Sequence, residues 1–346
     1  MVCIAAFIIL AIIGIFVAII SIFKREVGKK YLKIFKKAWG CVGKKVRLQK
    51  CETGFKDDIK NTILSRVIIS HPKLVKPLGI LIEALSVIIV LVAIWALLTA
   101  VKSLLALWAL GTCNVTKPAA CSLGAEVCSI DESEPSNLFE STTRWFEEWG
   151  EIFTAIPDKF KTYDPETFDF STIEASKNDN SVAIDILDPG CSVCMASYKN
   201  QKSSGFFDSY HVKIVLFAIQ NPDGSFKFKN SDLIVRVAYA LNEKYPEKTI
   251  DFIDKLFTGH DESGTNYQSL FNNTYDSSAA LEKLDEFLTE LGLEKGEITK
   301  IHESTNSAEL TSLLDKNRAI VETGIRAKGI PTMLYHNQKH TGLYKP

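Results

Sequence analysis

The sequence predicts an α/β domain that follows two transmembrane helices. Two long apolar runs lie in the first third of the 346-residue chain. The second half alternates short apolar runs with amphipathic helical patterns, in the order strand, helix, strand, helices, strand. The charges are also separated along the chain: residues 24–77 carry 16 basic and 4 acidic side chains, and residues 111–346 carry 23 and 36. This separation argues against a plain cytosolic globular protein.

The two apolar runs are long enough to cross a membrane. Val2–Phe23 contains 22 residues without a charge, and Ala84–Val101 contains 18, whereas a hydrocarbon core about 30 Å thick needs a helix of roughly 20 residues. A cleaved signal peptide is the alternative for the first run. However, no basic residue precedes it, and Lys24 and Arg25 follow it directly. A buried helix of a soluble domain is the alternative for the second run. Trp108 argues against this alternative, because it lies where aromatic residues are found at a membrane interface.

The basic loop between the two runs sets the expected topology. Loops rich in Lys and Arg stay in the cytoplasm, so both termini are expected outside in a multi-pass protein of the cell membrane. Lys102 is expected to snorkel or to begin a short interfacial helix. The predicted parts are a first span (1–23), a basic cytoplasmic loop (24–77), a second span with an interfacial segment (78–110), a cysteine-containing membrane-proximal segment (111–171) and an α/β domain (172–346).

The exported part begins with a helical pattern over 136–156 that Pro157 ends. This helix packs on the neighbouring domain or, alternatively, lies at the membrane surface. The polar residues 157–180 are expected to form a linker. Further apolar patterns predict strands at 181–187, 211–219 and 332–336, and helices at 191–199, 232–244, 279–291 and 307–325.

Cysteines are concentrated in the exported part. Cys113, Cys121 and Cys128 follow the second span, and one structural disulfide is expected among them, with three pairings open. A relay of electrons from this cluster to Cys191 is the alternative. Cys3 lies in the first span, and Cys41 and Cys51 lie in the basic loop. Cys41 and Cys51 are either two incidental thiols or two of the ligands of a zinc site.

Cys191 and Cys194 form the one CxxC motif of the chain. A zinc half-site, a structural disulfide and a redox-active dithiol are the three possible interpretations, and the context favours the dithiol. A helix that begins at the first cysteine lowers the pKa of its exposed thiol, and the second cysteine, one turn later, can resolve a mixed disulfide. Asp185 lies in the preceding strand and either exchanges a proton with Cys194 or faces water.

Gly329-Ile330-Pro331-Thr332 precedes the last predicted strand, and Pro331 either follows a cis peptide bond or is an ordinary loop proline. With the strand at 182–187 and the CxxC motif, these residues resemble the thioredoxin superfamily, and their order is most similar to its exported DsbA-like branch. The resemblance covers about residues 172–346 and implies a thioredoxin-like fold whose helical insertion spans roughly 232–325.

The resemblance also implies roles for individual residues. Cys191 would be the nucleophile, Cys194 the thiol that forms the redox disulfide with it, and Asp185 the proton partner. Ile330 and Pro331 would line the groove that binds an extended peptide. Ser192-Val193 is neither the His-containing pair of strong oxidants nor the Gly-Pro of reductases, so the direction of electron flow stays open.

The sequence therefore predicts a membrane-anchored thiol–disulfide oxidoreductase that acts on the thiols or disulfides of exported polypeptides. It would need an electron partner in the membrane, but no metal, organic cofactor or nucleic acid. Two alternatives belong to other classes. One is a redox-inactive thioredoxin-like binding module, and the other is a copper-binding protein that uses Cys191, Cys194 and Met195.

Overall fold

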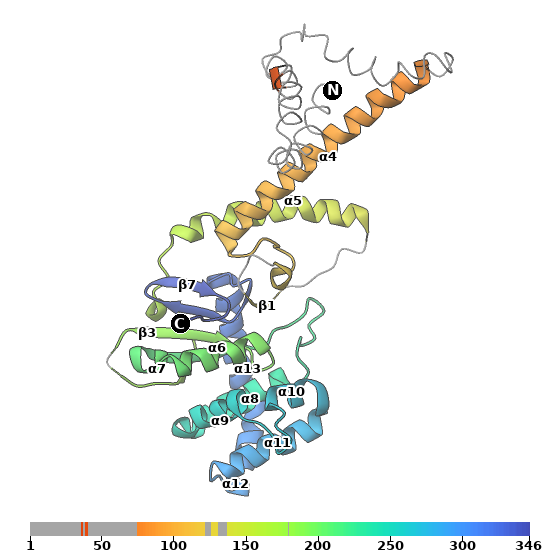
Figure 1. The fold of residues 1–346 in the computed structure, drawn as a ribbon. Coiled ribbons are helices and arrows are strands. Elements are labelled where there is room, and N and C mark those ends of the chain that lie inside the picture. Colours follow the sequence, from red (N-terminus) through yellow and green to blue (C-terminus); the bar gives the residue numbers. More distant parts are fainter. Residues whose placement is uncertain (1–35, 37–38, 41–74, 122–125, 131–136, 179) are drawn as a thin grey trace, which may run out of the picture. The chain divides into compact units, whose positions relative to one another are not determined.

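The computed structural model describes residues 36, 39–40, 75–121, 126–130, 137–178 and 180–346 (Figure 1). The chain divides into two compact units, residues 1–101 and 102–346. The first predicted span, 2–23, and nearly all of the basic loop 24–77 lie outside the described residues.

The second predicted span lies within α4, which runs from Val75 to Leu110. Val87–Leu110 is the one helix among the described residues that is long and apolar enough to cross a membrane, with a mean hydropathy of 2.5. The helix continues through Lys102, so no separate interfacial helix begins there. Lys102 is buried instead, because its ammonium group forms an ion pair with Glu148 and lies 5.3 Å from the Trp145 ring.

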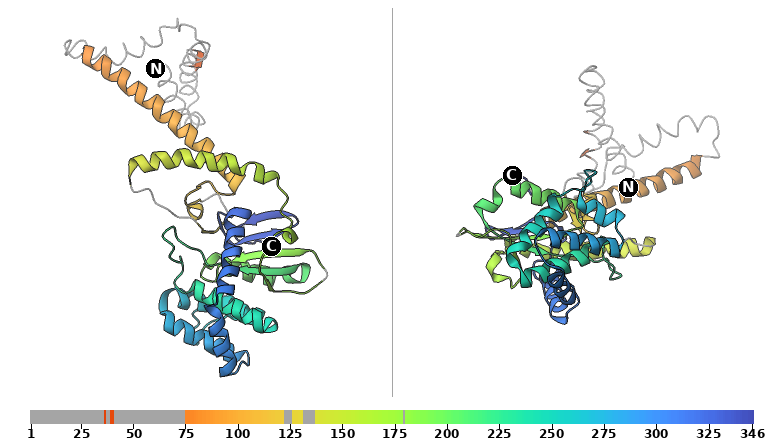
Figure 2. Two further views of the ribbon diagram at one scale, coloured as in Figure 1. Left: turned by 180° about the vertical axis from the view of Figure 1, so that it is seen from behind. Right: turned by 90° about the horizontal axis from the view of Figure 1, so that it is seen from below.

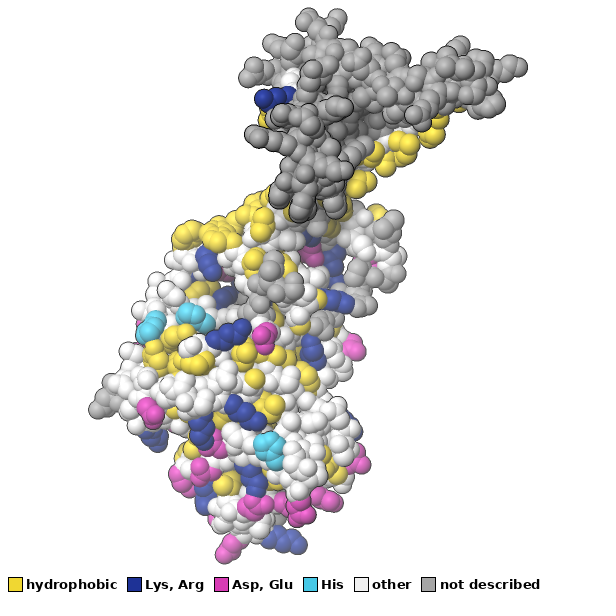
Figure 3. All heavy atoms as spheres, in the orientation of Figure 1, with side chains coloured by type: hydrophobic (Ala, Val, Ile, Leu, Met, Phe, Trp, Pro, Cys, Tyr) yellow, Lys and Arg dark blue, Asp and Glu magenta, His cyan; other side chains and the backbone are white. Residues whose placement is uncertain are grey.

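The predicted helix at 136–156 is α5, Leu138–Ala155, which belongs to the second unit and buries Ile152 and Ala155. The side chain of Asn137 caps it by accepting a hydrogen bond of 2.8 Å from the Glu140 N–H. Ile152 is fully buried in a small cluster with Ala106 and Val115. Figure 3 shows hydrophobic side chains gathered along this part of the surface, and the exposed aromatic residues are Phe139, Phe146, Phe153 and Phe160.

Residues 157–180 are not the linker that their polarity predicted. They contain two short 3₁₀ helices, η3 (Pro157–Phe160) and η4 (Pro165–Thr167), and an edge strand, β2 (Ile173–Glu174). Ile173 and Tyr163 are buried in the main core. Buried apolar side chains and hydrogen bonds, such as those between Asn317 and the Ser171 backbone, hold this polar segment against the domain.

The centre of the second unit is a five-stranded sheet in the order β2-β4-β3-β6-β7. Only β3 and β4 are parallel. The long segment between β4 and β6 contains most of the helices, as a helical insertion would. The remaining strands are β3 (Val182–Leu187), β4 (His211–Leu216), β6 (Thr332–Tyr335) and β7 (Gln338–Thr341). This sheet confirms the α/β architecture that the sequence predicts.

Helices cover both faces of this sheet. Ser192–Ser203 (α6) and Phe206–Ser209 (α7) lie on one face, and Ala308–Ala319 (α13) runs along the other (Figures 1 and 2). The insertion gathers at one end of the unit, below the sheet in Figure 1. It contains α8 (Ser231–Lys244), α9 (Pro246–Thr258), α10 (Tyr267–Ser269), the π-helical turn η5 (Leu270–Thr274), α11 (Ser277–Glu290) and α12 (Lys295–Thr305), while a second π-helical turn, η6 (Ile320–Gly324), follows α13.

A second, two-stranded sheet joins distant parts of the sequence. Cys128–Ser129 (β1) pairs antiparallel with Gly329–Ile330 (β5), so that Cys128 lies opposite Ile330. The loop before β1 contains a 3₁₀ turn, η2 (Pro118–Ala120), whose Ala119 N–H donates to Ser129 Oγ at 3.0 Å. Residues 128–129 thus reach the loop that precedes β6.

Candidate functional site

The CxxC motif stands where the central strand passes into a helix. β3 is an apolar run buried on both faces, and it ends at Leu187. The Asp188-Pro189-Gly190 turn follows, and Cys191 is the N-cap residue of α6, with an extended backbone (φ −82°, ψ 118°). This position places the Cys191 sulfur at the positive end of the helix dipole, as the sequence predicts.

The fold brings the distant proline loop against this motif. The Ile330–Pro331 peptide bond is cis. The Cys191 Sγ lies 3.8 Å from the Ile330 carbonyl oxygen, although 139 residues separate them in the chain. The fold therefore brings four of the predicted site residues close together, namely Cys191, Cys194, Ile330 and Pro331.

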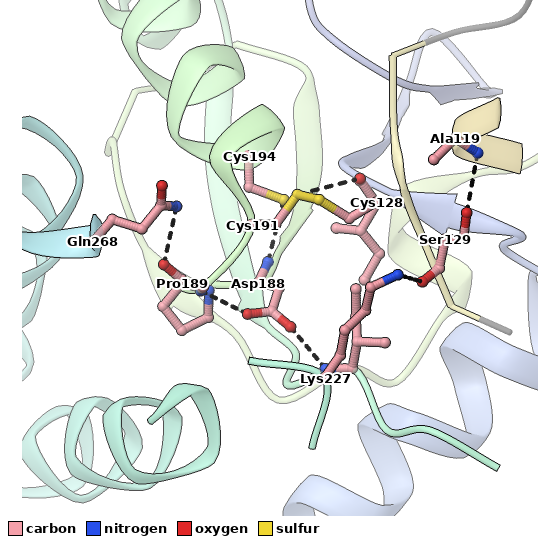
Figure 4. The surroundings of a disulfide bond; sticks show 12 residues. Ala119, Cys128, Ser129, Asp188, Pro189, Cys191, Cys194, Lys227 and Gln268 are labelled. Carbon is pink, nitrogen blue, oxygen red and sulfur yellow. Dashed lines mark hydrogen bonds between the residues drawn. A yellow bond between two sulfur atoms is a disulfide. The ribbon is translucent and has the colours of Figure 1, made fainter. Parts of the chain in front are cut away.

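The disulfide at the CxxC motif differs from the expected one, whereas one disulfide does form among Cys113, Cys121 and Cys128. Cys191 is bonded to Cys128 and not to Cys194, which is the one free cysteine among the described residues (Figure 4). The cause is the pairing of β1 with β5, which brings the two Cα atoms to 6.2 Å across 63 residues. The second disulfide joins Cys113 and Cys121, whose Cα atoms are 5.4 Å apart.

The first sulfur is not exposed, contrary to the expectation for an attacking thiol. Cys191 has no solvent-exposed surface. The residues around Cys128 cover it from the side of the proline loop (Figure 4). The burial extends to the residues before it in the chain, because the turn 188–190 is buried as well.

Cys194 lies one helical turn behind Cys191 and is fully buried. Its sulfur accepts a hydrogen bond of 3.4 Å from the Asp188 N–H. Burial raises the pKa of the Cys194 thiol well above its usual range, and the Asp188 and Asp185 carboxyl groups raise it further. The thiol is therefore protonated at neutral pH and needs a proton acceptor before it can attack a disulfide.

Asp185 is placed to interact with that thiol. It sits in β3 with no exposed surface, and neither carboxyl oxygen has a hydrogen-bond partner among the described residues. Burial raises the pKa of Asp185 to about 7, although the nearby Gln201 side chain opposes the rise. The group can therefore gain or lose a proton at physiological pH, which fits the proton exchange with Cys194 that the resemblance implies.

Asp188 is a further site residue, which the sequence analysis assigned only to a turn. Its buried carboxyl group accepts hydrogen bonds of 2.7 Å from the Gly190 and Ile219 N–H groups, and one from the Ser231 hydroxyl. Burial raises its pKa to about 6, although these hydrogen bonds oppose the rise. The Asp-Pro-Gly sequence directly before the first cysteine is the signal that could have pointed to this role. Asp188 fixes the turn that presents Cys191.

The site is suited to thiol–disulfide exchange. Three sulfur atoms, two of them bonded, lie between a helix N-terminus and an extended backbone. In the described part of the chain, no group of three or more His, Cys, Asp or Glu side chains could hold a metal ion. The bond to Cys128 also prevents Cys191 from serving as a thiolate ligand in this state.

No protein-family model and no curated protein matches the sequence. Solved structures are similar to about half of the chain. The thiol-disulfide exchange protein alpha-DsbA2 from Wolbachia pipientis is 16% identical over 53% of this chain and 86% of its own, with a TM-score of 0.39. The catalytic domain of Proteus mirabilis ScsC is 10% identical over 50% of this chain and 82% of its own, with a TM-score of 0.36. The oxidoreductase DsbA from Xylella fastidiosa is 15% identical over 46% of this chain and 74% of its own, with a TM-score of 0.33.

Proposed function

We propose that the chain is a thiol–disulfide oxidoreductase that acts on exported polypeptides. One observation supports this function above the others: Cys191 caps α6 beside the cis Ile330–Pro331 bond and is joined by a disulfide to an extended peptide segment. This is the arrangement that a mixed disulfide with a substrate requires. A redox-inactive binding module would have no need of a free thiol directly behind that bond.

In the proposed reaction the Cys191 thiolate attacks a substrate disulfide, and one substrate sulfur leaves as a thiolate. Cys194 then attacks Cys191 Sγ, which releases the second substrate sulfur and forms the Cys191–Cys194 disulfide. Asp185 accepts the Cys194 proton and returns it in the reverse direction. Ile330 and Pro331 hold the substrate backbone extended. The same steps run backwards when the enzyme oxidises a substrate dithiol.

The proposed location is the outer face of a membrane. α4 provides one span, and a second at 2–23, with the loop 24–77 in the cytoplasm, would place both termini outside. The disulfides of the second unit are typical of oxidising compartments. The partners would then be exported polypeptides, the lipid bilayer and a membrane protein that exchanges electrons with the Cys191–Cys194 pair.

An activity assay with cysteine variants tests the function. The full chain in detergent is expected to catalyse the reduction of insulin disulfides or the oxidation of a dithiol peptide. Cys191→Ala is expected to abolish catalysis, and Cys194→Ser to accumulate a mixed disulfide with the substrate. Cys41→Ser is the matched control, because it removes a thiol of the basic loop. A Cys191→Ala variant as active as the parent would refute the proposal.

A further inference from the structure

The membrane-proximal residues 126–130 occupy the peptide groove of the candidate site. Beyond the pairing of β1 with β5, the Leu343 N–H donates to the Glu126 carbonyl at 3.0 Å, and the Ile130 N–H donates to the Lys328 carbonyl at 3.3 Å. Backbone hydrogen bonds thus hold both ends of a five-residue extended segment. This is the pattern by which an added strand binds a sheet edge.

Side chains fix the same segment in one register. Val127 lies over Gly329, where an added Cβ would be only 2.8 Å from the Val127 Cβ. Ser129 is fully buried, and its carbonyl accepts a hydrogen bond of 3.1 Å from the Lys227 ammonium group (Figure 4). Between these residues, Cys128 is bonded to Cys191. The segment therefore fits the groove through shape, hydrogen bonds and a covalent bond together.

We propose that residues 126–130 are an internal peptide ligand of the active site and that Cys128 is a third redox-active cysteine. In the closed state Cys128 is bonded to Cys191, and Cys194 is the free thiol. In the open state Cys191 is bonded to Cys194, and Cys128 is free. This inference rests on the proposed function, and it adds the regulation of that site by the membrane-proximal segment of the same chain.

The exchange between the two states is balanced without an external oxidant. The Cys194 thiol loses its proton and attacks Cys191 Sγ. The Cys191–Cys128 bond breaks as the Cys191–Cys194 bond forms, and Cys128 leaves as a thiolate that takes up one proton. One disulfide and one thiol are present before and after the step. A dithiol substrate can transfer its two electrons to the open state only after residues 126–130 leave the groove.

The tether makes the internal peptide a strong competitor. A segment held on the same chain has an effective concentration on the order of 1 mM. An external peptide of equal intrinsic affinity at about 10 µM would therefore be disfavoured about 100-fold. The closed state should keep Cys191 unreactive until a peptide of higher affinity, or a partner that displaces residues 126–130, arrives.

Disulfide mapping of the full chain in detergent tests the two states. The oxidised parent is digested without reduction, and the linked peptides are identified by mass spectrometry. We expect both the Cys128–Cys191 and the Cys191–Cys194 pairs in the parent. Only the first pair is expected in Cys194→Ser, and only the second in Cys128→Ser. A parent that contains no Cys128–Cys191 pair would overturn the inference.

Reaction rates with an external peptide give a second readout. Cys128→Ser, with its Cys191–Cys194 bond formed, is expected to oxidise a dithiol peptide at about 10 µM up to about 100-fold faster than the parent. An unchanged rate would overturn the inference and leave the proposed function intact. If Cys191→Ala retained activity, the proposed function itself would fail, so the two failures are distinguishable.

A variant that keeps every sulfur atom completes the test. Gly329→Ala adds a methyl group that collides with Val127, so it should shift the parent's mixture toward the Cys191–Cys194 pair. Gly296→Ala in α12 is the matched control, because nothing lies within 4 Å of its added Cβ. A Gly329→Ala variant with the same mixture as the parent would contradict the role of the groove. This readout stands even if Cys128→Ser fails to fold.

Discussion

Asp185 gives the sharpest quantitative test of the site. Its carboxyl group has no exposed surface, and burial raises its pKa from 3.8 to about 7. Holding the charged form inside the fold costs about 1.4 kcal/mol for each pH unit between these two values. Because the folded state binds the proton more tightly than the unfolded chain does, the cost develops as pH rises from 3.8 to 7 and is constant above that range.

Replacing the carboxyl group by an amide of the same shape removes this cost. The free energy of unfolding of Asp185→Asn should exceed that of the parent by about 2 kcal/mol at pH 5 and by about 4 kcal/mol at pH 8. The stabilisation by the substitution is therefore larger at pH 8 than at pH 5. For a unit of this size, the difference corresponds to roughly 4–10 °C in the melting temperature of the variant relative to the parent. Thermal unfolding of the full chain in detergent, followed by intrinsic fluorescence, measures the difference at each pH.

A surface carboxylate provides the control for this measurement. Asp315 lies on α13 and is exposed, so Asp315→Asn removes a carboxylate without removing a cost of burial. If Asp185→Asn gave the same change at pH 5 and pH 8, or destabilised the chain more at pH 8, the burial argument would be refuted. The proton-exchange role of Asp185 would then lose its physical basis as well.

Three further substitutions test the packing that positions the site. Asn317 is buried and hydrogen-bonds both the N–H and the carbonyl of Ser171, so Asn317→Ala should lower the free energy of unfolding by about 1–3 kcal/mol in a denaturant titration. Phe287 is fully buried in the helical insertion, and Phe287→Ala should cost about 3–5 kcal/mol in the same titration; a loss below 1 kcal/mol would argue against that core. An added Cβ at Gly190 would lie 2.3 Å from the Phe228 Cβ, so Gly190→Ala should cost about 1–3 kcal/mol and alter the disulfide map around Cys191; an unchanged map and melting temperature would contradict this contact.

The local elements of the domain could be predicted from the sequence with some omissions. Continuous apolar runs mark β3, β4 and β6, and amphipathic periods mark α8, α11 and α13. The helices α9 and α12 were not predicted. α9 begins at Pro246 and buries Phe252, Ile253 and Leu256, which is a readable signal. α12 is mostly polar, and its clearest local signal is the capping box between Glu294 and Glu297.

The edges of the sheet were harder to predict. β2 has only two residues, and the four residues of β7 are all polar, so neither strand has a hydrophobic pattern of its own. β7 is held as the second strand of a hairpin with β6, through a turn in which His336 and Asn337 have positive φ angles of 51° and 59°. Pairing with a neighbouring strand, which a single sequence does not show, decides such elements.

The sequence by itself determined the chemistry that is local to the chain: a pair of thiols at the start of a helix, an acid six residues earlier, and a proline loop before the last strands. Only the tertiary structure decided which thiols are bonded. Disulfide pairing depends on the distance between Cα atoms, and the Cys128–Cys191 distance is set by the register of β1 on β5, across parts of the chain 200 residues apart. The same holds for Asp185, whose raised pKa depends on its burial in the central strand, between β4 and the distant β6.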